Sequence, residues 1–132
     1  MISGNVRRTA EIAFGDPDSD KYIDLKDYQK NPHRASFGWT SNNSVFAYVG
    51  MDYSKICDRI IHNGEPGFAW LENIREYSRL NGFRDYRDVR AKGGNPCLEQ
   101  TLESYELCCL VETFPAHHNT LHDFLETLRY AY

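Results

Sequence analysis

A short stretch late in the chain, residues 93–100, restricts most strongly what this sequence can fold into. It reads Gly-Gly-Asn-Pro-Cys-Leu-Glu-Gln. Pro96 disfavours helical backbone at Asn95, so extended backbone is expected across the stretch. Alternate residues of an extended segment point the same way, which puts Asn95, Cys97 and Glu99 on one face. The glycine pair gives the backbone freedom and leaves it bare, as a loop that reaches into a confined site requires.

Around this stretch, strand-like and helix-like patterns alternate, which indicates the α/β class. Strands are predicted at residues 9–14, 44–49 and 105–114, the last of them mostly buried. Helices are predicted where apolar residues recur at helical spacing, at residues 54–63, at about 68–80 and from about 119. Residues 20–29 are compatible with either a helix or an irregular segment. The charged residues 83–92 are compatible with a solvated surface or a polar site.

Length and composition limit the function classes that remain. The chain has 132 residues, enough for one domain but too few for a barrel of ten strands. Its 15 Lys and Arg against 19 Asp and Glu give a net charge of −4, which argues against a nucleic-acid-binding protein. No apolar run approaches the roughly 18 residues that a membrane span needs, and the first residues lack the apolar core of a signal peptide. We therefore expect a cytoplasmic protein whose four cysteines are thiols, metal ligands or catalytic groups.

The loop and its surroundings resemble a known enzyme family. Residues 95–99 and 102–108 resemble the active-site finger loop of ribonucleotide reductase large subunits, most closely of the adenosylcobalamin-dependent (class II) kind. Residues 3–12, 39–45 and 64–68 resemble successive segments of the same family's catalytic barrel. The resemblance implies that residues 1–132 form a single partial domain of a ten-stranded α/β barrel, with the finger loop at about residues 93–104. The last helix reaches Tyr132 without a stop signal, so we expect an internal piece of that barrel.

The resemblance implies a role for each polar residue of the loop. Cys97 would carry the thiyl radical that removes the 3′ hydrogen from the ribose of a ribonucleoside di- or triphosphate. Glu99 would accept the proton of the 3′ hydroxyl as a general base, and Asn95 would orient the sugar. Cys108 would be one of two thiols that supply reducing equivalents by closing a disulfide, the other lying outside this chain. Its neighbour Cys109 matches no catalytic position of the family.

The resemblance also implies a cofactor and partners. The cofactor would be adenosylcobalamin, although the segment that binds it is not found in this sequence. The partners would be the ribonucleotide substrate, the remaining segments or subunits of the reductase, and a thioredoxin-type reductant. The product would serve DNA precursor synthesis. The isolated chain is therefore expected to be inactive.

Two further pairs of polar residues each allow two interpretations. Ser41 and Asn42 either line the nucleotide site or belong to a turn whose side chains cap its own backbone. Arg7 and Arg8 either bind phosphate, for which guanidinium groups are suited, or form a surface pair.

Two other functions are compatible with the sequence. The first is an inactive, free-standing interaction module that keeps the fold and has lost the chemistry. The second is a small zinc-binding domain that uses Cys97, Cys108, Cys109, His117 and His118. The spacing of these residues departs from the usual zinc patterns, and adjacent cysteines are awkward ligands for one ion, so we expect no metal site. The histidine pair is expected to form a polar cap before the final helix.

Overall fold

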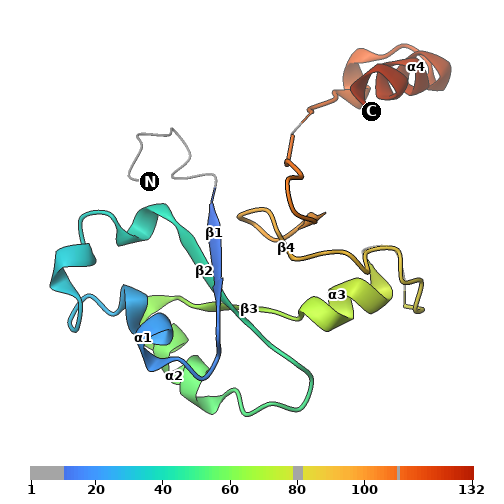
Figure 1. The fold of residues 1–132 in the computed structure, drawn as a ribbon. Coiled ribbons are helices and arrows are strands. Elements are labelled where there is room, and N and C mark those ends of the chain that lie inside the picture. The colour runs from blue at the N-terminus through green and yellow to red at the C-terminus, as the bar shows by residue number, and fades with distance from the viewer. Residues whose placement is uncertain (1–10, 79–81, 110) are drawn as a thin grey trace.

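Within the part of the chain that the structure describes, three parallel strands form the main sheet. The computed structural model describes residues 11–78, 82–109 and 111–132. The strands lie in the order β1 (Ile12–Gly15), β2 (Asn42–Phe46) and β3 (Gly67–Ala69), as Figure 1 shows. β2 is central, with Ile12 beside Asn42 on one side and Gly67 beside Ser44 on the other. The α/β class is confirmed, as are the first two predicted strands apart from their exact ends. Residues 9 and 10 lie outside the described residues.

Helical connections carry the chain from one strand to the next, as parallel pairing requires. Between β1 and β2 lie α1 (Asp20–Ile23) and short 3₁₀ turns at Asp24–Lys26, Pro32–Arg34 and Gly38–Thr40. The segment 20–29 therefore combines the two alternatives, a short helix followed by irregular backbone. Between β2 and β3 lies α2 (Ser54–Asn63), which spans the predicted residues. It ends at Gly64, whose φ of 74° is the left-handed conformation that closes many helices.

The core lies where α1 and α2 meet the sheet. Ile23 of α1, Val45 of β2 and Ile56 of α2 are almost completely buried and pack together. Four partly buried side chains surround this cluster: Tyr22, Met51, Ile60 and Phe68. Because so few side chains are fully buried, each contributes strongly to stability. Truncating Ile56 to alanine is expected to lower the free energy of unfolding by about 2–5 kcal/mol.

The Tyr22 hydroxyl ties β1 to β2 beside this core. It lies 2.5 Å from the Ala13 carbonyl oxygen and 3.0 Å from that of Ser44. Burial raises the pKa of Tyr22 to about 12, because the phenolate would lose its hydration. The hydroxyl therefore stays protonated, and able to donate, far above neutral pH.

Ion pairs hold the connections against one another. Lys26 is buried, and its Nζ binds the carboxylate of Glu65. Asp24 accepts hydrogen bonds from Lys30 Nζ at 2.5 Å and from Arg59 Nε at 2.7 Å. The hydrogen bond from Lys30, followed by that from Arg59, holds the pKa of Asp24 below its ordinary value. α2 is thus linked to the connection between β1 and β2 by charge as well as by apolar packing.

The helix predicted at about residues 68–80 begins later than expected. Phe68 belongs to β3, where the Ala47 amide donates to the Ala69 carbonyl at 2.9 Å, and α3 spans Leu71–Tyr77. Sheet pairing prevails over the helical spacing that starts at Phe68, because a local pattern is a weak preference beside tertiary contacts. Residues 79–81 lie outside the described residues.

The buried strand predicted at residues 105–114 is wrong for the described part of that range, which omits residue 110. The backbone there is irregular, and its large apolar side chains are exposed, namely Tyr105, Leu107, Val111 and Phe114. A buried strand needs neighbours to pair with, and none of the described strands pairs with this range. Figure 1 shows the range as a connection that leads to α4 (Leu121–Ala131).

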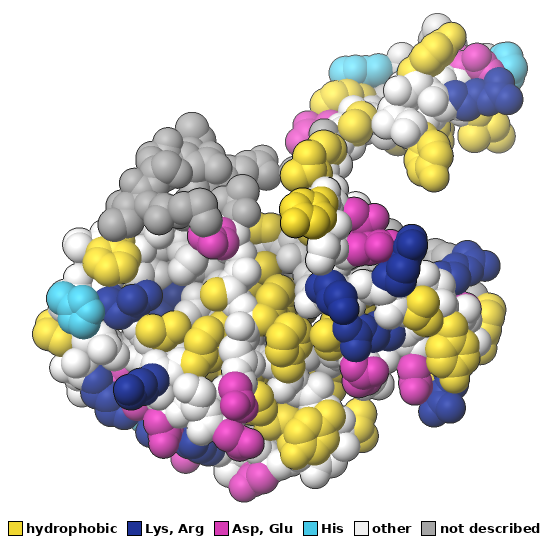
Figure 2. Space-filling model, in the orientation of Figure 1, with side chains coloured by type: hydrophobic (Ala, Val, Ile, Leu, Met, Phe, Trp, Pro, Cys, Tyr) yellow, Lys and Arg dark blue, Asp and Glu magenta, His cyan; other side chains and the backbone are white. Residues whose placement is uncertain are grey.

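α4 confirms the predicted final amphipathic helix. The Thr120 side chain caps it by accepting a hydrogen bond from the Asp123 amide at 3.1 Å. Figure 2 shows hydrophobic side chains on the surface of this helix, which lies apart from the sheet. Among the residues that the structure describes, no helix is both long enough and apolar enough to cross a membrane.

Candidate active site

The stretch that dominates the sequence forms a hairpin. β4 (Gly93–Gly94) pairs antiparallel with β5 (Thr101–Leu102), so that Gly93 lies opposite Leu102 and Gly94 opposite Thr101. The Asn95 amide extends this ladder by donating to the Gln100 carbonyl at 3.0 Å. The predicted polar residues therefore lie on the loop of a hairpin.

The loop turns instead of running extended, so the predicted alternation over residues 95–99 is wrong. The Leu98 amide donates to the Asn95 carbonyl at 2.8 Å, which closes a four-residue turn, and Leu98 has a φ of 60°. Pro96 occupies the second position of this turn, where its fixed φ is favoured. The proline that predicted extended backbone thus fits a tight turn equally well.

Asn95 lies inside the hairpin, with 4% of its surface exposed. Its Oδ1 accepts a hydrogen bond from the Gln100 amide at 2.9 Å, and its Nδ2 donates to Cys108 Sγ at 3.5 Å. The carboxamide therefore braces the turn and holds the second predicted thiol next to it. Oδ1 retains a lone pair that can accept a further hydrogen bond.

Cys97 and Glu99 are exposed on the same turn, so the three loop residues do not share one face. Cys108 is half-buried, whereas Cys109 and the helical Cys57 are exposed, and all four cysteines are free thiols. The site therefore combines an accessible thiol, an accessible carboxylate and a buried carboxamide that holds a second thiol. Such a set can exchange hydrogen, accept a proton and orient a hydroxyl-bearing ligand.

Two contacts among the described residues attach the hairpin to the main sheet. Asn42 Nδ2 at the start of β2 donates to the Pro96 carbonyl at 2.5 Å. A Cβ atom at Gly93 would lie only 2.7 Å from Phe14 Cε2, so the bare backbone is what lets the hairpin approach β1. The glycine pair therefore works at the base of the hairpin and not at its tip.

Ser41 and Asn42, which the sequence assigns either to a nucleotide site or to a self-capping turn, differ in their contacts. The Ser41 hydroxyl lies 3.3 Å from Asn43 Oδ1, and its carbonyl accepts a hydrogen bond from Lys26. The first contact lies within the turn, and the second comes from Lys26, 15 positions away. Asn42 instead reaches the hairpin, a contact across 54 sequence positions that no local pattern signals. Arg7 and Arg8 lie outside the described residues.

The charged segment before the hairpin also supports it, a role that the sequence analysis missed. Asp88 Oδ2 accepts a hydrogen bond from Thr101 Oγ1 at 2.8 Å, and Arg75 of α3 donates from Nε to the Ala91 carbonyl at 2.9 Å. An ion pair joins Arg90 to Glu103 at 2.8 Å. The sequence did carry a signal for this role, namely the alternating charges of residues 84–92 immediately before the glycine pair.

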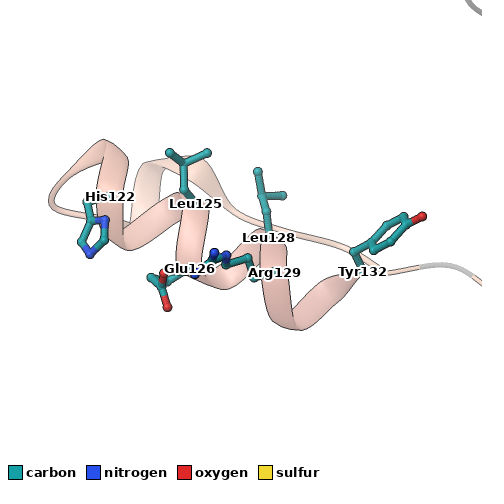
Figure 3. Close-up of a pocket in the computed structure, with 6 residues that line it drawn as sticks. All are labelled: His122, Leu125, Glu126, Leu128, Arg129 and Tyr132. Atoms are coloured by element: carbon teal, nitrogen blue, oxygen red, sulfur yellow. Dashed lines mark hydrogen bonds and ion pairs between the residues drawn. The ribbon is translucent and has the colours of Figure 1, made fainter.

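The described residues place no three His, Cys, Asp or Glu side chains together as metal ligands, so the zinc alternative has no geometric support among them. His118 instead lies 3.1 Å from Asp123 in the first turn of α4, as a polar cap would. Figure 3 shows a hollow along this helix lined by His122, Leu125, Glu126, Leu128, Arg129 and Tyr132. All six come from α4 and the residue after it, so the hollow is open and no second element of the described chain closes it.

Comparisons with known proteins agree on one family. No protein-family model and no solved structure matches the chain. The chain is 70% identical over 133 residues to a probable adenosylcobalamin-dependent ribonucleoside-triphosphate reductase of Dictyostelium discoideum. This alignment covers 100% of this chain and 18% of the relative. It is 65% identical over 127 residues to the adenosylcobalamin-dependent ribonucleoside-triphosphate reductase of Euglena gracilis, and 41% identical over 117 residues to that of Lactobacillus gasseri. These alignments cover 96% and 87% of this chain, and 17% and 16% of the relatives.

The chain therefore spans less than a fifth of the length of the curated relatives that it matches. The Dictyostelium alignment includes the whole chain, and so the sheet, the hairpin and the final helix. By its sequence, the chain is therefore similar to one segment of adenosylcobalamin-dependent ribonucleoside-triphosphate reductases.

Proposed function

We propose that this chain supplies the active-site loop of a ribonucleotide reductase that converts ribonucleoside triphosphates into 2′-deoxyribonucleotides. The observation that carries the proposal is the 70% identity to a reductase along the entire chain, hairpin included. The active loop would span residues 93–104, within one part of the family's α/β barrel. Because the relatives are more than five times longer, activity requires the remaining reductase segments.

The loop residues would divide the chemistry at the ribose. Cys97, as a thiyl radical, takes the 3′ hydrogen atom and returns it at the end of the turnover. Glu99 accepts the proton of the 3′ hydroxyl and later returns it, and the 2′ hydroxyl leaves as water with a proton from one of the two reducing thiols. Both side chains are exposed on the turn, so a substrate docked over the hairpin can reach them. Asn95 orients the sugar through the free lone pair of Oδ1.

Cys108 would be the reducing thiol that this chain contributes. Together with a cysteine from another part of the reductase it supplies the reducing equivalents and closes a disulfide, which a thioredoxin-type reductant reopens. The contact of Cys108 with Asn95 supports this assignment over Cys109, which has no such contact among the described residues.

The cofactor in the names of the relatives, adenosylcobalamin, supplies radical chemistry when it is bound. The hollow along α4 does not fit so large a group, because it is open and lined by a single helix. We therefore assign no cofactor contact to this chain, and the roles above belong to its own side chains.

A segment exchange in a full-length relative tests the proposal. This chain replaces the 65% identical segment of the Euglena gracilis reductase, and reduction of ribonucleoside triphosphates is measured with adenosylcobalamin and a dithiol reductant. We expect the exchanged enzyme to be active. Cys97→Ser and Glu99→Gln should lower turnover to the background, whereas the adjacent-thiol control Cys109→Ser should leave it unchanged.

Either of two outcomes would contradict the proposal. Turnover in the Cys97→Ser enzyme would remove the radical role of that residue. If the exchanged enzyme folds but has no activity, with or without the substitution at Cys97, the result would favour an interaction module that has lost the chemistry.

A further inference from the structure

The hydrogen bond from Asn42 to the Pro96 carbonyl has no role in the chemistry proposed above, yet it joins the sheet to the loop that carries Cys97. We infer that Asn42 is a positioning residue, which sets the place of the Cys97 thiol relative to the sheet. The inference rests on the proposed function, since it assigns a purpose to the geometry of that thiol.

The donor side of this hydrogen bond is rigid. Asn42 is the first residue of β2, the central strand, and lies in register with Ile12 of β1. Its own amide donates to the Glu11 carbonyl at 3.3 Å, so the backbone that bears the carboxamide is held by the neighbouring strand. The next two residues, Asn43 and Ser44, are buried. The short side chain of Asn42, attached to backbone held in this way, has little freedom to follow a moving loop.

The acceptor side transmits the constraint directly to the thiol-bearing residue. The Pro96 carbonyl belongs to the peptide unit that ends at the Cys97 Cα atom. Because a peptide unit is planar, fixing its oxygen also restrains that Cα. The proline ring fixes φ on the other side of the same carbonyl. One hydrogen bond therefore restrains the atom from which the Cys97 side chain projects.

The other contacts of the turn cannot replace this one. The hydrogen bond from the Leu98 amide to the Asn95 carbonyl sets the internal shape of the turn and not its position above the sheet. The packing of Gly93 against Phe14 holds the base of the hairpin, on the far side of Asn95 from Cys97. The Asn42 hydrogen bond, by contrast, ties the turn itself to the main sheet.

A misplacement of about 1 Å in a reacting group can cost about 100-fold in rate. Loss of the Asn42 hydrogen bond should therefore lower kcat while leaving KM for the ribonucleotide unchanged, because uniform substrate binding is not altered. The alternative from the sequence, a substrate-binding Asn42, predicts the opposite split, a raised KM. The engagement of Nδ2 with Pro96 favours the positioning role.

The test uses the exchanged, full-length reductase described above. Asn42→Asp keeps the shape but replaces the donor with an acceptor, Asn42→Ala removes the group, and Asn42→Gln keeps a donor on a longer side chain. The matched control is Asn31→Ala, which removes another asparagine-to-carbonyl hydrogen bond, from Nδ2 to the Asp24 carbonyl at 2.8 Å, away from the hairpin. We expect kcat to fall about 10- to 100-fold for Asp and Ala, to recover in part for Gln, and to be unchanged for Asn31→Ala.

A second measurement does not depend on turnover. The rate of Cys97 alkylation in the resting enzyme should rise for Asn42→Ala and Asn42→Asp, because a released turn exposes the thiol in more orientations, and should stay constant for Asn31→Ala. Unchanged kcat and an unchanged alkylation rate in Asn42→Ala and Asn42→Asp would overturn the inference. A raised KM with kcat preserved would overturn it too. The Cys97→Ser enzyme distinguishes failure of the proposed function from failure of the positioning role. If Cys97→Ser is active, the proposed function itself fails. If Cys97→Ser is inactive and Asn42→Ala is normal, only the positioning role of Asn42 is removed.

Discussion

The carboxamide of Asn95 holds the thiol of Cys108, with Nδ2 3.5 Å from Sγ across 13 positions of the sequence. This contact joins the turn of the hairpin to the irregular segment that follows β5. It accompanies a difference between two adjacent cysteines, since Cys108 is half-buried and Cys109 is exposed. Two residues of the same type thus occupy different environments within one short segment.

This difference predicts an order of thiol reactivity. In the native chain, Cys57, Cys97 and Cys109 should be alkylated by iodoacetamide in a fast phase and Cys108 in a slower one, because access to the sulfur limits reaction. Asn95→Ala should bring Cys108 toward the fast phase by removing its contact. Peptide mass spectrometry after timed quenching measures each site. Equal rates for Cys108 and Cys109 would show that the contact with Asn95 does not shield the thiol.

The approach of the hairpin to β1 makes a second prediction, at Gly93. A Cβ atom there would lie 2.7 Å from the ring of Phe14, so Gly93→Ala forces the hairpin and the sheet apart. Overpacking of this kind is expected to lower the free energy of unfolding by about 1–3 kcal/mol, measured by urea denaturation. Gly82→Ala is the control, since no atom lies within 4 Å of the added Cβ. A loss at Gly82 as large as that at Gly93 would contradict this explanation.

The local elements were predictable where their stabilising contacts are themselves local. The helix at residues 54–63 has both an apolar stripe and a glycine stop, and it forms over the predicted residues. The final helix likewise follows from its spacing and from Thr120 as its cap. The strand predicted at residues 105–114 was wrong because a buried strand depends on neighbouring strands, and an apolar composition does not show that such neighbours exist.

The candidate site was predictable in its residue types and not in its geometry. Pro96 restricts Asn95, but a turn satisfies that restriction as well as an extended segment does, and only hydrogen bonds such as that of Leu98 with Asn95 distinguish them. The roles of Cys97 and Glu99 stay predictions. The contact of Asn42 with Pro96 could not be read from either segment, because it depends on how the sheet and the hairpin meet.

The Tyr22 hydroxyl predicts a loss of stability in alkali. Its pKa is about 12 in the folded chain against an ordinary value of 10.0, so the folded state resists deprotonation. The contribution is fully present below pH 10 and is lost as the pH rises from 10 to about 12. Between these values the free energy of unfolding should fall more steeply for the native chain than for Tyr22→Phe.

Urea denaturation at a series of pH values measures this difference. At neutral pH, Tyr22→Phe should cost about 0.5–1.5 kcal/mol, because the hydrogen bonding from the Tyr22 hydroxyl to β1 and β2 is lost. Tyr48→Phe is the control, since Tyr48 is exposed and should leave both the stability and its pH dependence unchanged. Parallel alkaline slopes for the native chain and Tyr22→Phe would show that this hydroxyl is not the group responsible.

The exposed leucines of α4 predict self-association of the chain when it is expressed alone. Leu121, Leu125 and Leu128 recur at helical spacing with 37% to 72% of their surfaces exposed, and exposed apolar surface of this kind favours association. Sedimentation velocity over a concentration series should show a rising mean mass, and Leu125→Glu should reduce it by adding a charge to this face. Thr127→Glu adds the same charge two positions along the helix, about 160° around its axis from Leu125, and should have no effect. If both variants associate as the native chain does, contacts elsewhere, such as the exposed Leu107, must be responsible.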